Sequence, residues 1–523
     1  MTTRDLSSMV NTARHLSCGT ALAVMCGAPA LAGVGVDTSA LNEAVTLEGV
    51  RSHLEVFQQI ADDNGGTREA SSDGYFDSVA YVGRLMALAG YEVDVQLFPY
   101  LVFENNSPAE FAQVSPVPMD YVLDDEEGFA EATYSGSGDV TATVEGVDLL
   151  IPAAADANTS TSGCEAEDFA QFTAGNIALL QRGACSFFLK AANAEEAGAS
   201  AVIIFNEGQP GRTAALSATL GGPGVSIPVV GTSYVVGTEL AGGEATARVM
   251  VDALTEERIS ANVLADTPIG NPDETVVVGG HLDSVDEGPG INDNGSGSAV
   301  LLEVALQMSA LGFLDNEDTG VRNRVRFAWW GAEEAGLLGS EYYVNTVSDA
   351  EFEQIVANLN FDMVGSPNYV RFVYDGDGSA SAEAGPEGSA FIEWLFNDYF
   401  MEQGLATAPT AFDGRSDYGP FIQYGIPAGG LFTGAEGVKT EEEAGIFGGV
   451  AGEAYDACYH AACDTIDNIN DQGLDEMADA MAYAINVLAV NDLPMPSAKQ
   501  AGRKRSAGQS VMDMDYRGNR LQK

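Results

Sequence analysis

The sequence contains little positive charge and few long apolar runs. Only 23 Lys and Arg residues stand against 77 Asp and Glu residues, and the formal net charge is -54. Such a chain repels phosphate backbones and anionic membrane surfaces, which argues against nucleic-acid binding. Beyond the N-terminal segment no apolar run reaches the ~18 residues that a membrane span needs. The acidity itself is as consistent with a salty habitat as with simple solubility.

Cysteine is also scarce, with 6 residues in the chain. Near the N-terminus a basic pair precedes an apolar run, and residues 30–32 (Ala-Leu-Ala) have the small-x-small pattern of a cleavage site. This predicts that residues 1–32 are a secretory signal peptide and that the protein is secreted, extracellular or periplasmic. A lipid anchor on Cys26 is the disfavoured alternative. Cleavage before Gly33 leaves four cysteines, an even number suited to an oxidising compartment.

The apolar patterns divide the rest of the chain into two kinds of structure. Residues 33–129 and 251–495 alternate between helix-like and strand-like segments, which predicts an α/β domain with a mostly parallel mixed sheet flanked by helices. Residues 130–250 are richer in short Thr, Val, Gly and Ala runs and predict a mainly β insert in that domain. Residues 496–523 collect basic side chains and are expected to form a flexible tail, possibly a C-terminal propeptide.

Two of the four histidines lie in loops rich in carboxylates. His281 follows the apolar run TVVVGG, and active sites of open α/β sheets form beyond the carboxyl ends of the strands. Asp283 stands where a carboxylate can orient the imidazole, as is common around a metal-bound histidine. His460 lies between Cys458 and Cys463, whose short separation can close a small disulfide ring.

Further carboxylates recur at equivalent places along the predicted sheet. Asp293 precedes a predicted helix in GINDNGSGSA, and Asp362 follows the run NLNF. Glu333 and Glu334 follow the run FAWWGA. Two histidines with these carboxylates are the ligand set expected for two divalent cations, zinc first. Of two adjacent glutamates, one can bind a metal while its neighbour takes a proton from water.

The ordered motifs resemble those of one enzyme family over residues 40–490. The motifs HLDS, GINDNGSGS, WWGAEEAGLLGSEYY, NFDMVGSPN, AFDGRSDYGPF and CYHAACDT resemble the co-catalytic zinc aminopeptidases, especially the secreted bacterial leucine aminopeptidases and the aminopeptidase Y type. The resemblance implies the zinc-exopeptidase fold and two zinc ions per chain. It also implies that Asp293 bridges the ions, with His281 and Asp362 completing one site and Glu334 and His460 the other.

The same resemblance implies roles for four more residues. Glu333 is the implied general base, and Asp283 the residue that orients His281. Tyr459 is implied to donate a hydrogen bond to the developing oxyanion. Arg415 is similar to an arginine that helps to hold the substrate or product in the family. The peptide bond after the bridging aspartate is often cis in these enzymes.

The insert has a resemblance of its own. Its segment DFAQFTAGNIALLQRGACSFFLKAANAEEAGASAVIIFN, with IPVVGTS further on, resembles a protease-associated domain. In such domains a pair like Cys164 and Cys185 can form a disulfide. The insert is interpreted as a lid or recognition module, with a purely stabilising appendage as the alternative.

Together these resemblances imply a secreted zinc aminopeptidase, a monomer, that removes N-terminal leucine and other apolar residues from peptides or proteins. Two alternatives stay open. A carboxypeptidase of the same superfamily would need a cationic cluster to hold a substrate carboxylate, and Arg415 is its one evident candidate. A binding or receptor-like protein would use the fold without catalysis, although the full ligand set and Glu333 argue against it.

Overall fold

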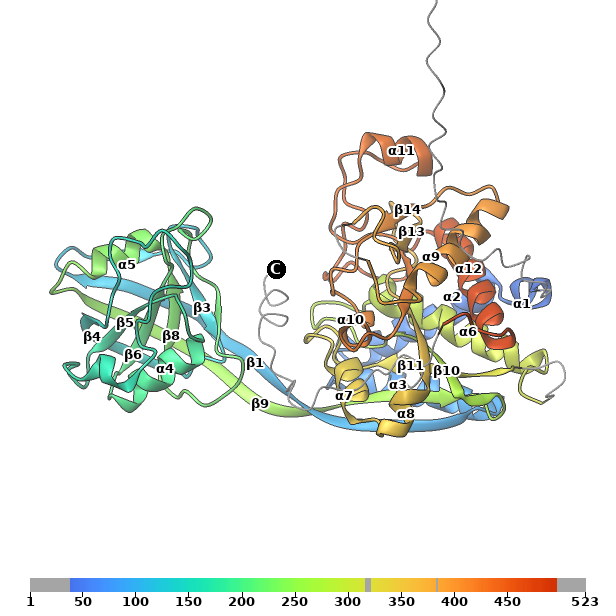
Figure 1. Cartoon of the computed structure of the whole chain (residues 1–523), viewed down its shortest axis with the longest axis horizontal. Coiled ribbons are helices and arrows are strands. Elements are labelled where there is room, and N and C mark those ends of the chain that lie inside the picture. Colours follow the sequence, from blue (N-terminus) through green and yellow to red (C-terminus); the bar gives the residue numbers. More distant parts are fainter. Residues whose placement is uncertain (1–37, 316–320, 382–383, 496–523) are drawn as a thin grey trace, which may run out of the picture. The chain divides into compact units, whose positions relative to one another are not determined.

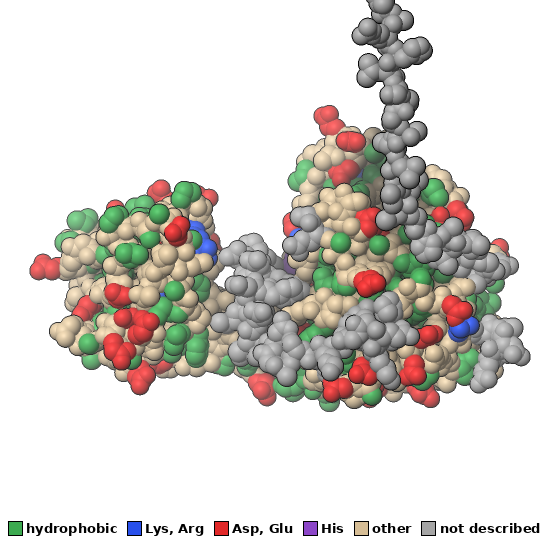
Figure 2. Space-filling model, viewed as in Figure 1, with side chains coloured by type: hydrophobic (Ala, Val, Ile, Leu, Met, Phe, Trp, Pro, Cys, Tyr) green, Lys and Arg blue, Asp and Glu red, His purple; other side chains and the backbone are tan. Residues whose placement is uncertain are grey.

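Figure 1 shows the computed structural model, which describes residues 38–315, 321–381 and 384–495. The predicted signal peptide, residues 1–32, and the predicted tail, residues 496–523, lie outside the described residues. Among the helices of the described ranges, none has the length and apolar character that a bilayer-spanning segment requires. The face drawn in Figure 2 carries many Asp and Glu side chains and few Lys or Arg side chains, as the charge balance predicts.

The α/β part of the chain is built from two stretches of sequence on either side of the insert. Its helices are α1 (Ser39–Ala44), α2 (Leu47–Asp63), α3 (Asp73–Ala89), α6 (Gly297–Ala310), α7 (Leu338–Thr346), α8 (Asp349–Gln354), α9 (Ser389–Glu402), α10 (Tyr418–Gln423), α11 (Glu441–Phe447) and α12 (Asp471–Val490). Its strands are β1 (Glu92–Ser115), β9 (Thr246–Asp266), β10 (Asn271–His281), β11 (Asn323–Trp330), β12 (Ile355–Phe361), β13 (Phe372–Tyr374), β14 (Ala408–Thr410) and β15 (Ala428–Phe432).

These strands form a mixed sheet in the order β14-β13-β15-β12-β10-β11-β9, with β1 paired to β9. The four central strands, β15, β12, β10 and β11, run parallel to one another. The strands β9 and β13 pair with them in the antiparallel sense. Every residue of β12 is buried, as expected for a parallel strand that is covered on both faces. The predicted fold class is therefore confirmed.

Two adjacent tryptophans of β11 show how both faces of the sheet are covered. Successive side chains of a strand point to opposite faces. The Trp329 indole nitrogen donates to the carbonyl of Ser298 in α6, at 3.1 Å. The Trp330 ring packs on the opposite face, against Tyr343 of α7 and Phe421 of α10. Helices therefore cover the central strands on both faces of the sheet.

A largely buried ion pair joins the antiparallel strand β9 to the central strand β11. Arg326 on β11 makes two 2.6 Å contacts with the carboxylate of Asp266 on β9, and it donates to the Tyr343 hydroxyl at 2.9 Å. Without Arg326, Asp266 keeps only a longer contact of 3.7 Å with Arg324, so the cost should lie near the low end of the about 3–5 kcal/mol typical of a broken buried pair. We expect Arg326→Met to lower the free energy of unfolding by about 3 kcal/mol.

The measurement is urea denaturation followed by tryptophan fluorescence, because Trp329 and Trp330 lie close to the pair on the same strand. The control is Arg84→Met, which removes an exposed arginine from α3. A loss of stability in Arg326→Met no larger than in this control would contradict the expectation.

The insert lies between β1 and β9 in the sequence, and its strands extend the same sheet through β4, which pairs antiparallel with β9. Its elements are β2 (Met119–Tyr121), β3 (Phe129–Thr133), β4 (Gly138–Gly146), the 3₁₀ helix η1 (Ala166–Phe169), β5 (Ile177–Gln181), α4 (Phe187–Glu196), β6 (Ala201–Phe205), β7 (Ala218–Thr219), β8 (Val229–Thr232) and α5 (Tyr234–Leu240). The strands β4, β5, β6 and β8 are parallel neighbours. Cys164 and Cys185 form the predicted disulfide, with an S–S distance of 2.08 Å.

The apolar core of the insert also includes residues of the two long strands that lead into it. The strands β1 and β9 pair antiparallel from Glu92 opposite Asp266 to Ser115 opposite Thr246. Ala109 and Phe111 of β1 belong to the same buried apolar cluster as Ile177 and Ile203 of the insert. The outer ends of β1 and β9 are therefore part of the insert's core.

Candidate metal centre

The predicted ligands meet at the carboxyl edge of the central sheet. His281 is the last residue of β10, and Asp362 directly follows β12. Glu334 lies in the loop after β11, and Asp293 lies in the π-helical turn η2 (Ile291–Ser296), before α6. Parallel strands end at the same edge, so side chains distant in sequence converge there. His460 comes from a loop much later in the chain.

Asp293 lies between the two histidines. One of its carboxylate oxygens is 3.2 Å from His281 Nε2, and the other is 3.2 Å from His460 Nε2. Asp362 Oδ1 is 3.3 Å from His281 Nε2, and Glu334 Oε2 is 2.9 Å from His460 Nε2. Two groups of three ligand atoms therefore share Asp293, and within each group the atoms lie within 4.8 Å of one another.

This set of atoms fits a pair of zinc ions. Zinc prefers imidazole nitrogen together with carboxylate oxygen, and both groups offer them. Among the described residues, the buried Glu334 Oε1 has no hydrogen-bond partner. Buried polar atoms are normally paired, so an atom without a partner inside a ligand group is consistent with a cation held there.

Burial and close charges set the protonation of these groups. Burial raises the pKa of Glu334 to about 7, and the negative charge of Asp293 acts in the same direction. Burial by itself lowers the pKa of His460, but its hydrogen bonds with Asp293 and Glu334 outweigh burial and raise the pKa to about 10. A divalent cation would compete with the protons at these sites, because metal ligands bind in their deprotonated forms.

Glu333 stands beside the ligands without belonging to either group. It is 9% exposed, and its Oε2 lies 3.9 Å from His281 Nε2. Burial raises the pKa of Glu333 well above its usual value, opposed by His281 and reinforced by the negative charges of Asp417 and Asp362. A carboxylate with a raised pKa is a better proton acceptor for catalysis near neutral pH.

The sequence predicts that the Asp283 carboxylate orients the His281 imidazole. In the structure the closer contact to that ring comes from the Asp283 backbone. Its backbone carbonyl oxygen lies 3.2 Å from His281 Nδ1, whereas its carboxylate is farther away, at 3.7 Å. The carboxylate accepts the backbone N–H groups of Glu333 and Glu334, at 3.2 and 3.3 Å. Asp283 therefore joins the strand end that carries His281 to the loop that carries the two glutamates.

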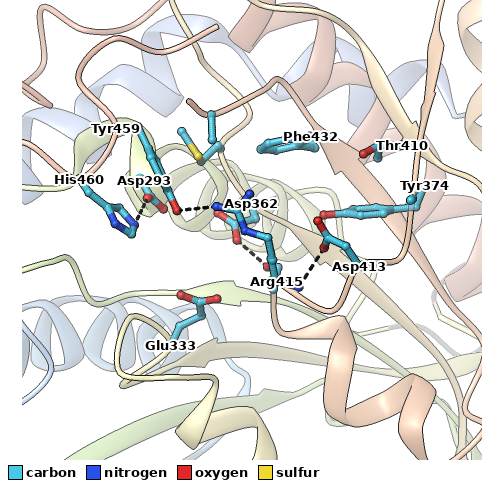
Figure 3. A pocket seen from close by; sticks show the side chains of 14 residues that line it. Asp293, Glu333, Asp362, Tyr374, Thr410, Asp413, Arg415, Phe432, Tyr459 and His460 are labelled. Atoms are coloured by element: carbon cyan, nitrogen blue, oxygen red, sulfur yellow. Dashed lines mark hydrogen bonds and ion pairs between the residues drawn. The ribbon is translucent and has the colours of Figure 1, made fainter. Parts of the chain in front are cut away.

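A pocket opens beside these residues (Figure 3). Tyr459 and His460 lie at one end of it, and Thr410 and Tyr374 lie at the other. The apolar part of its wall is formed by Met363, Tyr374, Phe432, Ala411 and Ala435. The pocket is therefore lined both by apolar side chains and by candidate ligands.

Tyr459 and Arg415 face this pocket together. The Tyr459 ring stacks on His460, with the ring centres 3.8 Å apart. Arg415 donates to the Tyr459 hydroxyl oxygen at 3.3 Å and pairs with Glu436 at 2.9 Å. Burial and the charges of Asp293 and Glu334 raise the pKa of Tyr459, so its hydroxyl keeps its proton.

Several residues at the site were not assigned from the sequence. Ser416 donates to Asp362 Oδ2 at 2.5 Å and accepts from the Asn360 side chain at 2.8 Å. The carboxylate of Asp417 is completely buried, and burial raises its pKa to about 7. Ser416 and Asp417 lie in the motif AFDGRSDYGPF, whose sequence alone does not show which side chain faces the ligands.

Two covalent features of the loops agree with the sequence. Cys458 and Cys463 form the second predicted disulfide, with an S–S distance of 2.06 Å. The peptide bond between Asp293 and Asn294 is cis. The Asn294 side chain supports this turn, since it donates to the Phe361 carbonyl at 2.8 Å and accepts the backbone N–H of Met363 at 3.1 Å.

Comparison with known proteins gives consistent matches. Residues 262–485 match the model of peptidase family M28, and residues 148–240 match the PA domain. An aminopeptidase of Pseudomonas aeruginosa (strain UCBPP-PA14) is 46% identical over 474 residues, which cover 89% of this chain and 86% of that protein. Leucine aminopeptidase 2 of Trichophyton rubrum is 45% identical over 348 residues, 66% of this chain and 68% of that protein.

Two solved structures extend the comparison. The aminopeptidase from Aneurinibacillus sp. strain AM-1 has a TM-score of 0.62 and 28% identity, covering 87% of this chain and 97% of that chain. BSAP, a zinc aminopeptidase from Bacillus subtilis, has a TM-score of 0.53 and 25% identity, covering 86% of this chain and 99% of that chain.

Proposed function

The chain belongs to peptidase family M28 and contains a PA domain, and from this membership we propose that it is a zinc-dependent aminopeptidase. The observation that carries the proposal is the pair of three-residue ligand groups that share Asp293 beside an open pocket. The similar proteins named aminopeptidase and leucine aminopeptidase support the same activity. Its substrates are peptides and protein N-termini, from which it removes the first residue.

We assign two zinc ions to each chain, one held by His281 and Asp362, the other by Glu334 and His460, with Asp293 shared. When bound, such ions polarise the scissile carbonyl and lower the pKa of the attacking water. Glu333 takes a proton from that water, since it is buried next to the ligands and has a raised pKa. It then delivers the proton to the leaving amine, which must be protonated for the peptide bond to break.

Tyr459 stabilises the charge that develops on the carbonyl oxygen. Arg415 donates to the Tyr459 hydroxyl oxygen, so the hydroxyl hydrogen is free to point elsewhere. Because Tyr459 keeps its proton, it can donate this hydrogen to the oxyanion. The apolar wall with Met363 and Phe432 supports a preference for leucine and other apolar side chains.

The charges of the pocket favour an aminopeptidase over a carboxypeptidase. Of the described residues that line the pocket, Arg415 is the single Lys or Arg, and it is already paired with Glu436. A substrate carboxylate would have to displace that partner. The carboxylates that line the pocket suit the cationic amine of a free N-terminus instead. Blocking that amine should therefore abolish binding.

We also propose that the protein is secreted and that the insert has a role in substrate recognition. The two disulfides are consistent with an oxidising compartment and so support the predicted signal peptide. We propose that the PA domain is a recognition module for longer substrates, which leaves hydrolysis of small amides to the metal centre.

The decisive experiment compares leucine p-nitroanilide with its N-acetylated form, using purified protein with and without 1,10-phenanthroline. We expect hydrolysis of the free amine alone, loss of activity with the chelator, and recovery when zinc is returned. Activity on neither substrate in a protein that holds two zinc ions would refute the aminopeptidase and favour a carboxypeptidase or a binding protein. Activity that persists in the chelator would refute the metal centre.

A further inference from the structure

Two buried carboxylates fasten the loop of residues 457–463 to the bridging aspartate. Asp456 and Asp464 flank this loop and are 1% and 2% exposed. The Asp464 carboxylate accepts the backbone N–H groups of Asn292 and Asp293, both at 2.9 Å. The Asp456 carboxylate accepts the Asn292 side-chain amide at 2.6 Å. Such charge-assisted hydrogen bonds are strong because no water competes for them.

Asn468 and Asn292 extend this network across the site. The Asn468 side-chain nitrogen lies 3.0 Å from both oxygens of Asp456 and 3.0 Å from Asp464 Oδ1. Asn292 Oδ1 accepts the backbone N–H of Gly365 at 3.1 Å, in the segment that follows Asp362. The network therefore ties together the three chain segments that carry Asp293, Asp362 and His460.

Within the described residues, the His460 ring lacks a hydrogen bond that usually holds a metal-bound histidine in place. A metal-bound histidine usually donates its other ring nitrogen to a partner that fixes the ring. His281 has one, because its Nδ1 lies 3.2 Å from the Asp283 carbonyl oxygen. The buried Nδ1 of His460 has no hydrogen-bond partner in the described part of the chain. Its backbone also lies in the left-handed region, with φ of 53°, which is unfavourable for a non-glycine residue.

We propose that Asp456 and Asp464 are positioning residues of the metal site formed by Glu334 and His460. They hold the backbone on both sides of His460 at a fixed distance from Asp293, and so replace the ring hydrogen bond that His460 lacks. The inference rests on the zinc ligands proposed above and goes beyond them, because it makes one of the two sites depend on this network.

Asp464→Asn tests the proposal. The amide keeps one acceptor oxygen but turns an N–H₂ group toward a backbone N–H, so one of the two bonds to residues 292 and 293 is lost. We expect the dissociation constant of one of the two zinc ions, the one at the Glu334–His460 site, to rise by about 10–100-fold, with a smaller rise for the other ion, which shares Asp293. The measurement is competition with a chromogenic chelator on the full chain, together with the melting temperature.

Asp467→Asn is the matched control, since it makes the same change at an exposed aspartate in the same segment. Wild-type protein that binds fewer than two zinc ions would refute the proposed ligands themselves. Two ions in wild type and unchanged constants in Asp464→Asn would refute the positioning role alone. Equal weakening of both ions with a lowered melting temperature would show a general structural role, which also overturns it.

If Asp464→Asn does not fold, Asn468→Ala decides the question. This variant removes the side chain that joins the two carboxylates and leaves the backbone hydrogen bonds of Asp464 in place. We expect the dissociation constant of the same zinc ion to rise by roughly tenfold, at the low end of the effects seen for residues behind metal ligands. An unchanged constant in a folded Asn468→Ala protein would overturn the proposal.

Discussion

Replacing Glu333 with glutamine is expected to lower kcat by about 10²–10⁴-fold, the usual contribution of a positioned general base. Glutamine keeps the size of the side chain and one acceptor oxygen but cannot take a proton. Because Glu333 belongs to neither ligand group, the variant should still bind two zinc ions. The measurement is kcat on leucine p-nitroanilide, with the zinc content of the same sample.

Glu287→Gln is the control, because it makes the same substitution at an exposed glutamate in the loop after His281. It should leave kcat unchanged. If Glu333→Gln retained wild-type kcat, the proton would have to be taken by another group. If it lost a zinc ion, Glu333 would be a ligand and its role as a base would need revision.

Part of the site could be predicted because three of its proposed ligands, His281, Glu334 and Asp362, stand at or just after the ends of apolar strands. The runs directly before His281 and Asp362 are mainly apolar, which is the pattern of parallel strands buried on both faces. Parallel strands end at one edge, so the polar residues that follow them must lie near each other. The elements β10 and β12 are in fact neighbours in the sheet.

The residues behind the ligands could not be predicted in the same way. Ser416 reaches Asp362 across 54 positions of sequence, and Asp464 reaches Asp293 across 171. No local periodicity links such residues, because their contact depends on how separate loops fold over the strand ends. Asp283 illustrates this limit, since its carboxylate accepts two backbone N–H groups some 50 residues away.

The pairing of strands β1 and β9 could not be predicted from the sequence either. The sequence of β1 contains Pro99, Pro108 and the pair Asn105-Asn106, residue types that disfavour strands, so it does not indicate a single long strand. Their long pairing, which register shifts interrupt, joins two chain segments that are far apart in sequence. Composition shows that the insert differs from the rest of the chain, but not that Phe111 of β1 packs in its core.

Removing Asp293 is expected to have the most severe effect on metal binding, because it is the one residue shared by both ligand groups. Its two oxygens face His281 and His460, so Asp293→Ala deprives each site of a ligand and the mutual repulsion of two cations is no longer offset. We expect the variant to hold less than one zinc ion per chain. Activity should fall by at least about 10³-fold, because water without zinc has a pKa near 15.7 rather than near 7.

Glu334→Ala is the comparison variant, because it removes a ligand from only one of the two groups. It should keep about one zinc ion per chain, held by His281, Asp293 and Asp362, because that group remains intact. Elemental analysis of both variants after dialysis against the same zinc buffer measures the difference. A protein that kept two ions in Asp293→Ala would show that the carboxylate is not shared, and the two-zinc centre would have to be built from other oxygens.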